Sequence, residues 1–488
     1  MDPAIPSSIR AAFVVEGTRG DIQPYLAVAL RLIERGNDVK MFTNDDHVSF
    51  CESFNIPVEG VLYNFSVAMK SDEVREALAH GNAFKLQKCF QNMRTTSMPE
   101  DMKELWPALE SFQPTVLLAG GLSKTKAIIY SHAKTVPMVI VDLQIVMPLS
   151  DQAPSGLPNL PFGTNKIWFK LLLAGAGTYI KSMKGITKDT LDINMDGKFE
   201  IPIMDTIMTD IPSFPGPVCV GTSTFVIPLH PEWPKENFHT CGFFTIGKEK
   251  QELMMKDKSK GSQFGSDSNA ALTEFLSKGT PPVYVGWGSM LCKSEKWMVT
   301  LAVEALQHAG MRGVLLGGWA GLSQEHIPDH LVEYCNENVI FVPSAPHEWL
   351  FPQCSCIVHH GGSGTTAASV RSGRPTVITP VIGDQFDFAA GVKAVGCGFG
   401  LGQLGSMTGA ALGDAIMRCV NEESIIAQAK ETGVKLMAED GAENFCKVLD
   451  EWLITDFASG EWIKKHEALL RKCEEHWKTQ QKSMCTIS

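Results

Sequence analysis

The sequence lacks the features that mark zinc-bound, secreted or membrane-spanning chains. Its 13 cysteines include no Cys-x-x-Cys pair, so they form no familiar zinc-binding spacing. The first ten residues contain no apolar core of a secretory signal, and the most lipophilic stretch, residues 167–180, is shorter than the ~20 residues that span a bilayer. We therefore expect reduced thiols and a cytoplasmic protein, with room for a peripheral membrane contact.

Excess positive charge is absent as well. Lys and Arg total 43 against 54 Asp and Glu, which gives a net charge of −11. A general nucleic-acid binder needs a basic surface, so we expect no nucleic-acid partner. The remaining composition, 44% hydrophobic and 20% charged, is that of a globular protein. It excludes a disordered chain, a coiled coil and a collagen-like fibre.

Strand-like and helix-like segments alternate in both halves of the chain. In the first half, strand-like segments cover residues 9–17, 38–43, 115–121 and 137–143, with a helix-like pattern over 21–35. In the second half they cover residues 282–287, 313–317, 338–342, 356–359 and 375–380. This alternation predicts an α/β fold with two doubly wound parallel sheets. Because ligands bind at the carboxyl ends of such strands, the expected site is a cleft between the halves.

The length of 488 residues suits two or three domains. We predict an N-terminal domain over residues 1–246, a polar linker over 247–270, a C-terminal domain over 271–450 and a helical tail over 451–488. The proline-rich residues 151–220 indicate a long excursion from the first sheet.

A glycine-rich turn is the sharpest local signal. Residues 359–369 read HHGGSGTTAAS and join an apolar strand to an alanine-rich helix. Glycines let a ligand approach the backbone, and the N–H groups and dipole at a helix start favour an anion such as phosphate. Ser363 and Thr365 add hydroxyl donors, and His360 adds a ring N–H. The plain alternative is a structural turn in which Ser363 caps the helix.

The same region supports other interpretations. Residues 362–367 satisfy the dinucleotide fingerprint G-x-G-x-x-A, with Asp384 where a ribose-binding acid falls, which indicates an NAD(P)-dependent oxidoreductase. A second motif, GDQFDF at 383–388, instead favours a sugar, because Asp384 and Gln385 supply the acceptor and donor groups that vicinal hydroxyls require. A solvated loop with Asp384 as a helix cap is the plain alternative.

Taken in order, these motifs resemble a known family. HHGGSGTTAASVRSGRPTVITPVIGDQ resembles the C-terminal donor-binding signature of UDP-glycosyltransferases of the glycosyltransferase-B fold. GTRGDIQPYLAVALRLIERGNDV, at residues 17–39, resembles their N-terminal motif, and PPVYVGWGSM, GGWAGL and SAPHEWLFPQC follow in the family's order. The most similar branch is that of sterol 3-beta-glucosyltransferases and bacterial glycopeptide glucosyltransferases. The resemblance implies two Rossmann-like domains that face each other across a cleft.

The resemblance also implies a role for each matching residue. The donor diphosphate would contact His360, Ser363, Gly364 and Thr365, with Ser289 on the phosphate side. The donor sugar would contact Asp384 and Gln385, and the uridine would contact Ser344, Ala345 and His347. Thr18, Arg19 and Asp21 would face the reaction centre from the N-terminal half. Family members are inverting and need no metal, so no metal ion or other cofactor is expected.

Asp21 is the expected general base for the acceptor hydroxyl. From its position at the start of the first helix, a plain N-cap is the alternative. The helix N-terminus and Arg19 would both lower the pKa of Asp21 and weaken it as a base, whereas burial on cleft closure would raise it.

These expectations describe an inverting, metal-independent and monomeric enzyme. It would move a hexose, glucose first, from a UDP-sugar to a hydroxyl of a lipophilic acceptor such as a sterol. Two departures concern the acceptor: Ser363 stands where the sterol branch usually has Ala, and Phe-Asp-Phe follows Gly-Asp-Gln in place of an aromatic pair and Trp. The alternatives are the oxidoreductase, a sugar-nucleotide epimerase and a non-catalytic sugar-nucleotide binder.

Overall fold

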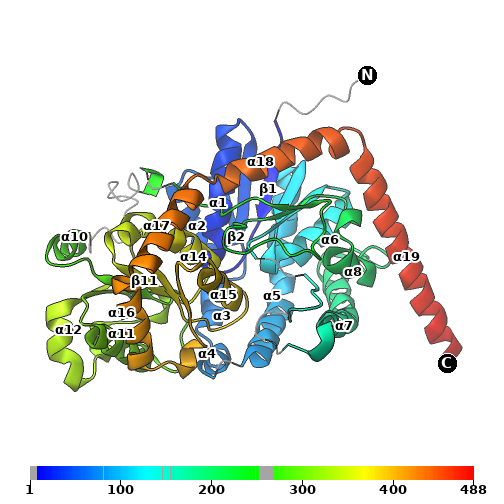
Figure 1. Cartoon of the computed structure of the whole chain (residues 1–488). Helices are drawn as coiled ribbons and strands as arrows, with labels where there is room; N and C mark the ends of the chain where they lie inside the picture. The colour runs from blue at the N-terminus through cyan, green and yellow to red at the C-terminus, as the bar shows by residue number, and fades with distance from the viewer. Residues whose placement is uncertain are drawn as a thin grey trace.

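Two parallel β-sheets form the centre of the protein (Figure 1). The computed structural model describes residues 8–80, 82–144, 147–153, 157, 159–247, 249–251 and 269–487. The first sheet has the strand order β3-β2-β1-β4-β5-β6-β7, and the second has the order β10-β9-β8-β11-β12-β13. The predicted α/β architecture with two doubly wound sheets is confirmed.

The first sheet contains β1 (Arg10–Val14), β2 (Asp38–Asn44), β3 (Val58–Leu62), β4 (Val116–Ala119), β5 (Met138–Asp142), β6 (Val218–Val220) and β7 (Phe238–Thr240). The second contains β8 (Val283–Gly286), β9 (Gly313–Leu316), β10 (Val339–Val342), β11 (Cys356–His359), β12 (Thr376–Ile378) and β13 (Gly398–Gly400). Central strands such as β1 and β4 are buried on both faces, which is why their sequences are continuous apolar runs.

The helices that precede the second sheet are α1 (Arg19–Glu34), α2 (Asp45–Ser53), α3 (Phe65–Met69), α4 (Asp72–Ala79), α5 (Ala83–Phe112), α6 (Lys124–Lys134), α7 (Lys166–Leu191), α8 (Ile201–Thr209) and α10 (Asn269–Ser277). The later helices are α11 (Glu295–Ala309), α12 (Val332–Asn338), α13 (His347–Leu350), α14 (Ser363–Arg371), α15 (Gln385–Val395), α16 (Gly409–Asn421), α17 (Glu423–Met437), α18 (Gly441–Trp452) and α19 (Glu461–Ile487). No helix in the described ranges has both the length and the apolar character needed to cross a membrane.

Every strand predicted from the sequence is present: most are shorter than predicted, β11 has the predicted bounds and β2 is one residue longer. The structure adds β3, β6, β7 and β13, of which the last three have only three residues each. Runs this short carry no readable periodicity, so their pairing depends on the neighbouring strand. Residues 252–268, most of the predicted linker, lie outside the described residues.

The end of the chain returns to the first half (Figure 1). Phe445 and Trp452 of α18 are buried in the same apolar cluster as β1 and α1. Arg35, the C-cap residue of α1, reinforces this contact through ion pairs of 2.6 Å with both Glu443 and Asp450. The last helix, α19, buries Leu469 and Cys473 against the first half.

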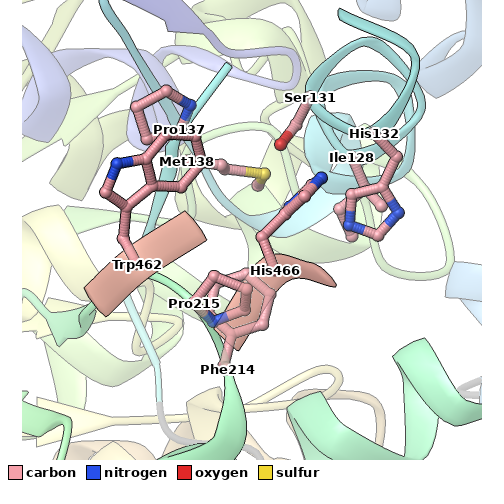
Figure 2. Close-up of a pocket in the computed structure, with 9 residues that line it drawn as sticks. All are labelled: Ile128, Ser131, His132, Pro137, Met138, Phe214, Pro215, Trp462 and His466. Carbon is pink, nitrogen blue, oxygen red and sulfur yellow. The ribbon is translucent and has the colours of Figure 1, made fainter. Parts of the chain in front are cut away.

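A small cavity lies where α19 covers this half (Figure 2). Two histidine rings face each other beside it, His132 of α6 and His466 of α19, with centroids 5.0 Å apart and planes at 81°. His132 Nδ1 donates to the carbonyl of Lys198 at 2.9 Å, whereas His466 Nε2 has no hydrogen-bond partner in the described part of the chain. Burial lowers the pKa of both, and that of His132 falls to about 3.

The substitution His466→Phe tests this pair. His132 stays neutral in the folded chain, and the lowered pKa of His466 also favours its neutral form, whereas both imidazoles take up protons in the unfolded chain. Stability therefore falls as the pH drops below about 6.5. His132, with a folded pKa of about 3, costs about 2 kcal/mol of stability between pH 8 and pH 5. We expect His466→Phe to lose less unfolding free energy over this range than the parent chain, measured by urea unfolding with circular dichroism.

The matched control is His330→Gln, because the His330 side chain is 66% exposed and remote from this contact. It should keep the pH dependence of the parent. An unchanged pH dependence in His466→Phe would show that the buried pair does not penalise protonation.

Candidate functional site

The carboxyl ends of four strands converge between the two halves. In the first sheet, β1 and β4 are neighbours, and the strands that follow each of them in sequence lie on opposite sides of this pair. In the second sheet, β8 and β11 form the corresponding pair. Such switch points are where open α/β sheets bind ligands. The glycine turns that follow β1 and β11 approach closely: a Cβ placed on Gly364 would lie 3.8 Å from Gly20 O. Ser363 Oγ also donates to Leu143 O at 3.3 Å, which joins the halves directly.

Asp21 lies in the first turn of α1 and is held by the residue that begins the helix. Thr18 is the N-cap, and both its backbone N–H and its hydroxyl donate to Asp21 Oδ2, at 2.7 and 3.0 Å. Asp21 is therefore not the N-cap itself, but as the N3 residue it completes a capping box with Thr18, so a helix-capping role for Asp21 stands beside the expected role as base. Gly17, with φ of +141°, leaves space for this carboxylate, because a Cβ there would lie 2.4 Å from Asp21 Oδ2.

The balance of forces on Asp21 favours a base. Burial in the cleft raises its pKa, and this outweighs the Thr18 hydrogen bonds and the charge of His47, which lower it. Arg19 lies over the Phe50 ring, 4.4 Å from its centroid, and its Nε donates to Gln23 at 3.2 Å. The expected lowering of the pKa of Asp21 is thus overcome by desolvation.

The turn after β11 has the geometry of an anion site. Gly361 has φ of +94°, and a Cβ there would lie 2.8 Å from Ile378, so the sharp bend requires glycine. The N-cap of α14 is Gly362, which corrects the alternative in which Ser363 caps this helix. The first helical hydrogen bond runs from Thr366 N to Gly362 O at 2.8 Å. The N–H groups of Ser363, Gly364 and Thr365 precede it and are available to a ligand.

Two predicted histidines lie beside this turn. His360 Nδ1 is buried without a hydrogen-bond partner among the described residues, and burial lowers the pKa of His360 to about 4. His347 stacks on Phe351 at 4.5 Å and 14°, and burial, followed by the charges of Arg19 and His360, lowers the pKa of His347 to about 3. Both rings are therefore neutral at pH 7, and His360 can serve only as a hydrogen-bonding group.

The second motif lies on the same side of the cleft. Asp384 is the N-cap residue of α15, but its side chain makes no capping hydrogen bond, so the plain capping role is not fulfilled. Burial and the nearby charges of Asp21 and Asp387 raise the pKa of Asp384 to about 7. Gln385 Oε1 accepts from the backbone N–H groups of Val381 and Ile382, at 2.8 and 3.1 Å, which leaves its NH₂ group to donate.

The remaining predicted residues lie at the ends of neighbouring strands. Ser289 is in the turn after β8, and Ser344 and Ala345 are in the loop between β10 and α13. Within the described ranges, none of the three makes a side-chain hydrogen bond to another predicted site residue. The structure thus brings Arg19 and His360 into electrostatic range of His347, and Asp21 into electrostatic range of Asp384.

Gln144 is a site residue that the sequence analysis missed. With its amide assigned so that the nitrogen faces Asp384, that nitrogen donates to Oδ1 and Oδ2 at 3.0 and 3.2 Å. Gln144 follows β5 of the first half, so this contact crosses the cleft. Its place directly after a predicted strand was the available signal, but the partner in the other half was not visible from sequence.

One further group of residues could coordinate a metal. Asp151, His230 and Glu232 offer ligand atoms within 4.8 Å of one another. Glu232 already forms an ion pair with Lys166 at 2.5 Å, and His230 Nε2 lies 3.0 Å from Asp151.

Two family models match separate parts of the chain. Residues 11–150 match the Glycosyltransferase family 28 N-terminal domain. Residues 322–449 match the Erythromycin biosynthesis protein CIII-like, C-terminal domain. The first match includes Asp21 and Gln144, and the second includes His360 and Asp384. Each side of the cleft therefore lies within one of the two matched segments.

Curated relatives include sterol 3-beta-glucosyltransferases. The chain is 26% identical over 447 residues to that of Arabidopsis thaliana, which covers 89% of this chain and 66% of the relative. It is 25% identical over 445 residues to that of Saccharomyces cerevisiae, which covers 89% of this chain and 34% of the relative. The chain therefore spans about two thirds of the plant relative and about a third of the yeast relative.

Solved structures share the architecture. The glycotransferase of kitacinnamycin superposes with a TM-score of 0.59 at 16% identity, covering 91% of this chain and 99% of the other. Glycosyltransferase VinC in complex with dTDP gives a TM-score of 0.56 at 14% identity and the same coverage. At these identities the likeness establishes the fold. The chain therefore resembles a glycosyltransferase family 28 N-terminal domain over residues 11–150 and an EryCIII-like C-terminal domain over residues 322–449, and its two sheets have the glycosyltransferase-B fold.

Proposed function

We propose that the protein is an inverting glycosyltransferase. It moves a hexose, glucose first, from a UDP-sugar to the hydroxyl of a lipophilic acceptor such as a sterol, and it needs no metal. One observation carries this proposal: Asp21 of the first half, desolvated in the cleft, lies within electrostatic range of Asp384 of the second half and close to the glycine turn that begins α14. The sterol 3-beta-glucosyltransferases among the relatives support the choice of glucose as the sugar and of a sterol as the acceptor.

Stabilisation of the leaving UDP falls to α14 and His360. As the bond between the anomeric carbon and the phosphate oxygen breaks, negative charge develops on the diphosphate. The free N–H groups at the start of α14 and the helix dipole oppose that charge. His360 is neutral at pH 7 because its pKa is about 4, and it donates a ring N–H. Fixed dipoles take the place of a cation in this proposal, which suits a chain with a net charge of −11.

Asp21 takes the proton from the acceptor hydroxyl. The oxygen of that hydroxyl attacks the anomeric carbon from the face opposite UDP, which inverts the configuration. The raised pKa of Asp21 brings its basicity closer to working pH, where proton transfer is most effective. Thr18 holds one carboxylate oxygen through two hydrogen bonds, so the carboxylate has a fixed orientation.

Asp384, Gln385 and Gln144 form the sugar-binding side. Asp384 accepts hydrogen bonds from sugar hydroxyls, and the free NH₂ group of Gln385 donates one. Gln144 reaches Asp384 from the opposite half, so it orients this carboxylate when the cleft is closed.

Transfer without a metal is the first expected outcome. UDP-glucose incubated with a 3-beta-hydroxysterol and excess EDTA should release UDP and form the glucoside, detected by mass spectrometry. Activity that is lost in EDTA and restored by Mg²⁺ would contradict the proposal. Stabilisation by NADPH but not by UDP-glucose in a thermal-shift assay would favour the oxidoreductase. Binding of UDP-glucose without transfer or hydrolysis would favour a non-catalytic binder.

Asp21→Asn should lower the rate of transfer by ~10²–10⁴-fold, because the variant keeps the shape of the side chain but removes the base. UDP affinity, measured by calorimetry, should change little. Asp72→Asn is the matched control, since Asp72 is an exposed acid in the first turn of α4. Transfer at the parent rate by Asp21→Asn would remove Asp21 as the base.

His360→Ala should weaken UDP binding by roughly 10–100-fold, the value of a hydrogen bond to a charged group. Because the pKa of His360 is about 4, the empty site holds a neutral ring at pH 6 and at pH 8 alike. The loss should therefore be similar at both pH values in calorimetric titrations. His330→Ala, on the exposed surface of the same half, is the control. Equal UDP affinities in parent and His360→Ala would show that the ring does not contact the diphosphate.

A further inference from the structure

The start of α7 presents large apolar side chains to solvent. Ile167, Leu171 and Leu172 are 46%, 59% and 42% exposed, and Phe162, just before the helix, is 99% exposed. Single exposed apolar residues are normal, but a group of four within residues 162–172 indicates a contact surface. We call these four residues and Lys170 the α7 surface. In Figure 1, α7 lies at the lower right edge of the molecule.

The other side of α7 is already packed. Phe169, Ile180 and Met183 are buried, at 4%, 2% and 1% exposure. Tyr179 adds a hydrogen bond of 3.0 Å to Thr125 and accepts one of 3.2 Å from Arg94. The helix is therefore fixed to the protein by one face, and the α7 surface is the face left without a partner in the described part of the chain.

The charge of this region differs from that of the rest of the chain. Residues 152–188 contain no Asp or Glu but five Lys, although the whole chain has a net charge of −11. Lys166 and Lys184 pair with acids elsewhere. Lys170 and Lys181 are exposed and form no ion pair with a described residue. Their spacing from Ile167 and Leu171 places them along the same side of the helix.

The α7 surface is continuous with the candidate site. Asn165, immediately before α7, donates from its Nδ2 to Ser150 O at 3.1 Å. Two residues further along, Gln152 Nε2 donates to Asp387 Oδ1 at 3.3 Å. Asp387 lies beside Asp384, so one short segment connects the start of α7 with the cleft.

We propose that the α7 surface docks on a lipid bilayer that contains anionic lipids. Its apolar side chains would enter the interface while Lys170 and Lys181 meet the phosphate headgroups. This inference rests on the proposed function in one respect, because a lipophilic acceptor would reach the cleft from the membrane on which the protein sits.

Two other occupants fit the surface less well. A bound acceptor molecule would be enclosed, whereas side chains exposed by 42–99% project outward. A second copy of the chain, paired through the same surface, would bring the unpaired lysines of both copies together. A bilayer with negative headgroups matches both the apolar and the positive groups.

The experiment is vesicle flotation of the full chain. Vesicles of phosphatidylcholine and phosphatidylserine at 70:30 are compared with vesicles of pure phosphatidylcholine. The protein should float with the anionic vesicles and less with the neutral ones, and the difference should shrink at high salt. The double variant Leu171→Glu/Leu172→Glu should lower the partition coefficient at least about tenfold, because two leucines no longer enter the apolar phase.

The matched control is Val434→Glu/Met437→Glu on α17, where the two side chains are 67% and 56% exposed. It should float like the parent. Equal flotation of the α7 variant and the parent, or no flotation of the parent, would overturn the proposal. A dimeric parent that becomes monomeric in the α7 variant, measured by light scattering without vesicles, would assign the surface to a second copy instead.

Stabilisation of each variant by UDP is measured in parallel. A variant that keeps the parent's thermal shift is folded, so its flotation reports the surface alone. Because flotation requires no sugar transfer, failure of the membrane contact leaves the glycosyltransferase proposal standing. An inactive parent that floats as expected would contradict only the proposed function.

Discussion

The close approach of two glycine turns determines how the candidate site is built. Gly20 and Gly364 carry no side chains that would hold the halves apart, so the starts of α1 and α14 face each other across the cleft. Each helix directs its positive end into the same space. A chain that is acidic overall thereby gains a local region that favours a diphosphate. The same closeness desolvates Asp21 and Asp384, which raises the pKa of both carboxyl groups.

Those two carboxyl groups have different hydrogen-bond partners. Asp21 is held on one oxygen by Thr18, which fixes the direction of its free oxygen. Asp384 is contacted from the other half by Gln144. A ligand that neutralised or displaced charge at Asp384 would therefore change the pKa of Asp21, because the two groups lie within electrostatic range. In the proposed function, donor binding and the base strength of Asp21 are coupled through this pair.

The sequence was informative wherever a local pattern decides the structure. The strand, glycine turn and helix at residues 356–371 form as predicted, because the bend at residue 361 requires a glycine. It was uninformative where a distant partner decides. Whether the pKa of Asp21 rises or falls depends on burial by the other half, and the role of Gln144 depends on Asp384. The three-residue strands β6, β7 and β13 are likewise specified by their neighbours in the sheet.

The return of α18 and α19 to the first half affects how the protein is made. Phe445 and Trp452 complete an apolar core whose other members, such as Val28 and Phe50, emerge from the ribosome several hundred residues earlier. The first half cannot finish its core until nearly the whole chain has been synthesised. The second half is therefore complete in sequence before the first can close, and the cleft between them is among the last features of the molecule to form.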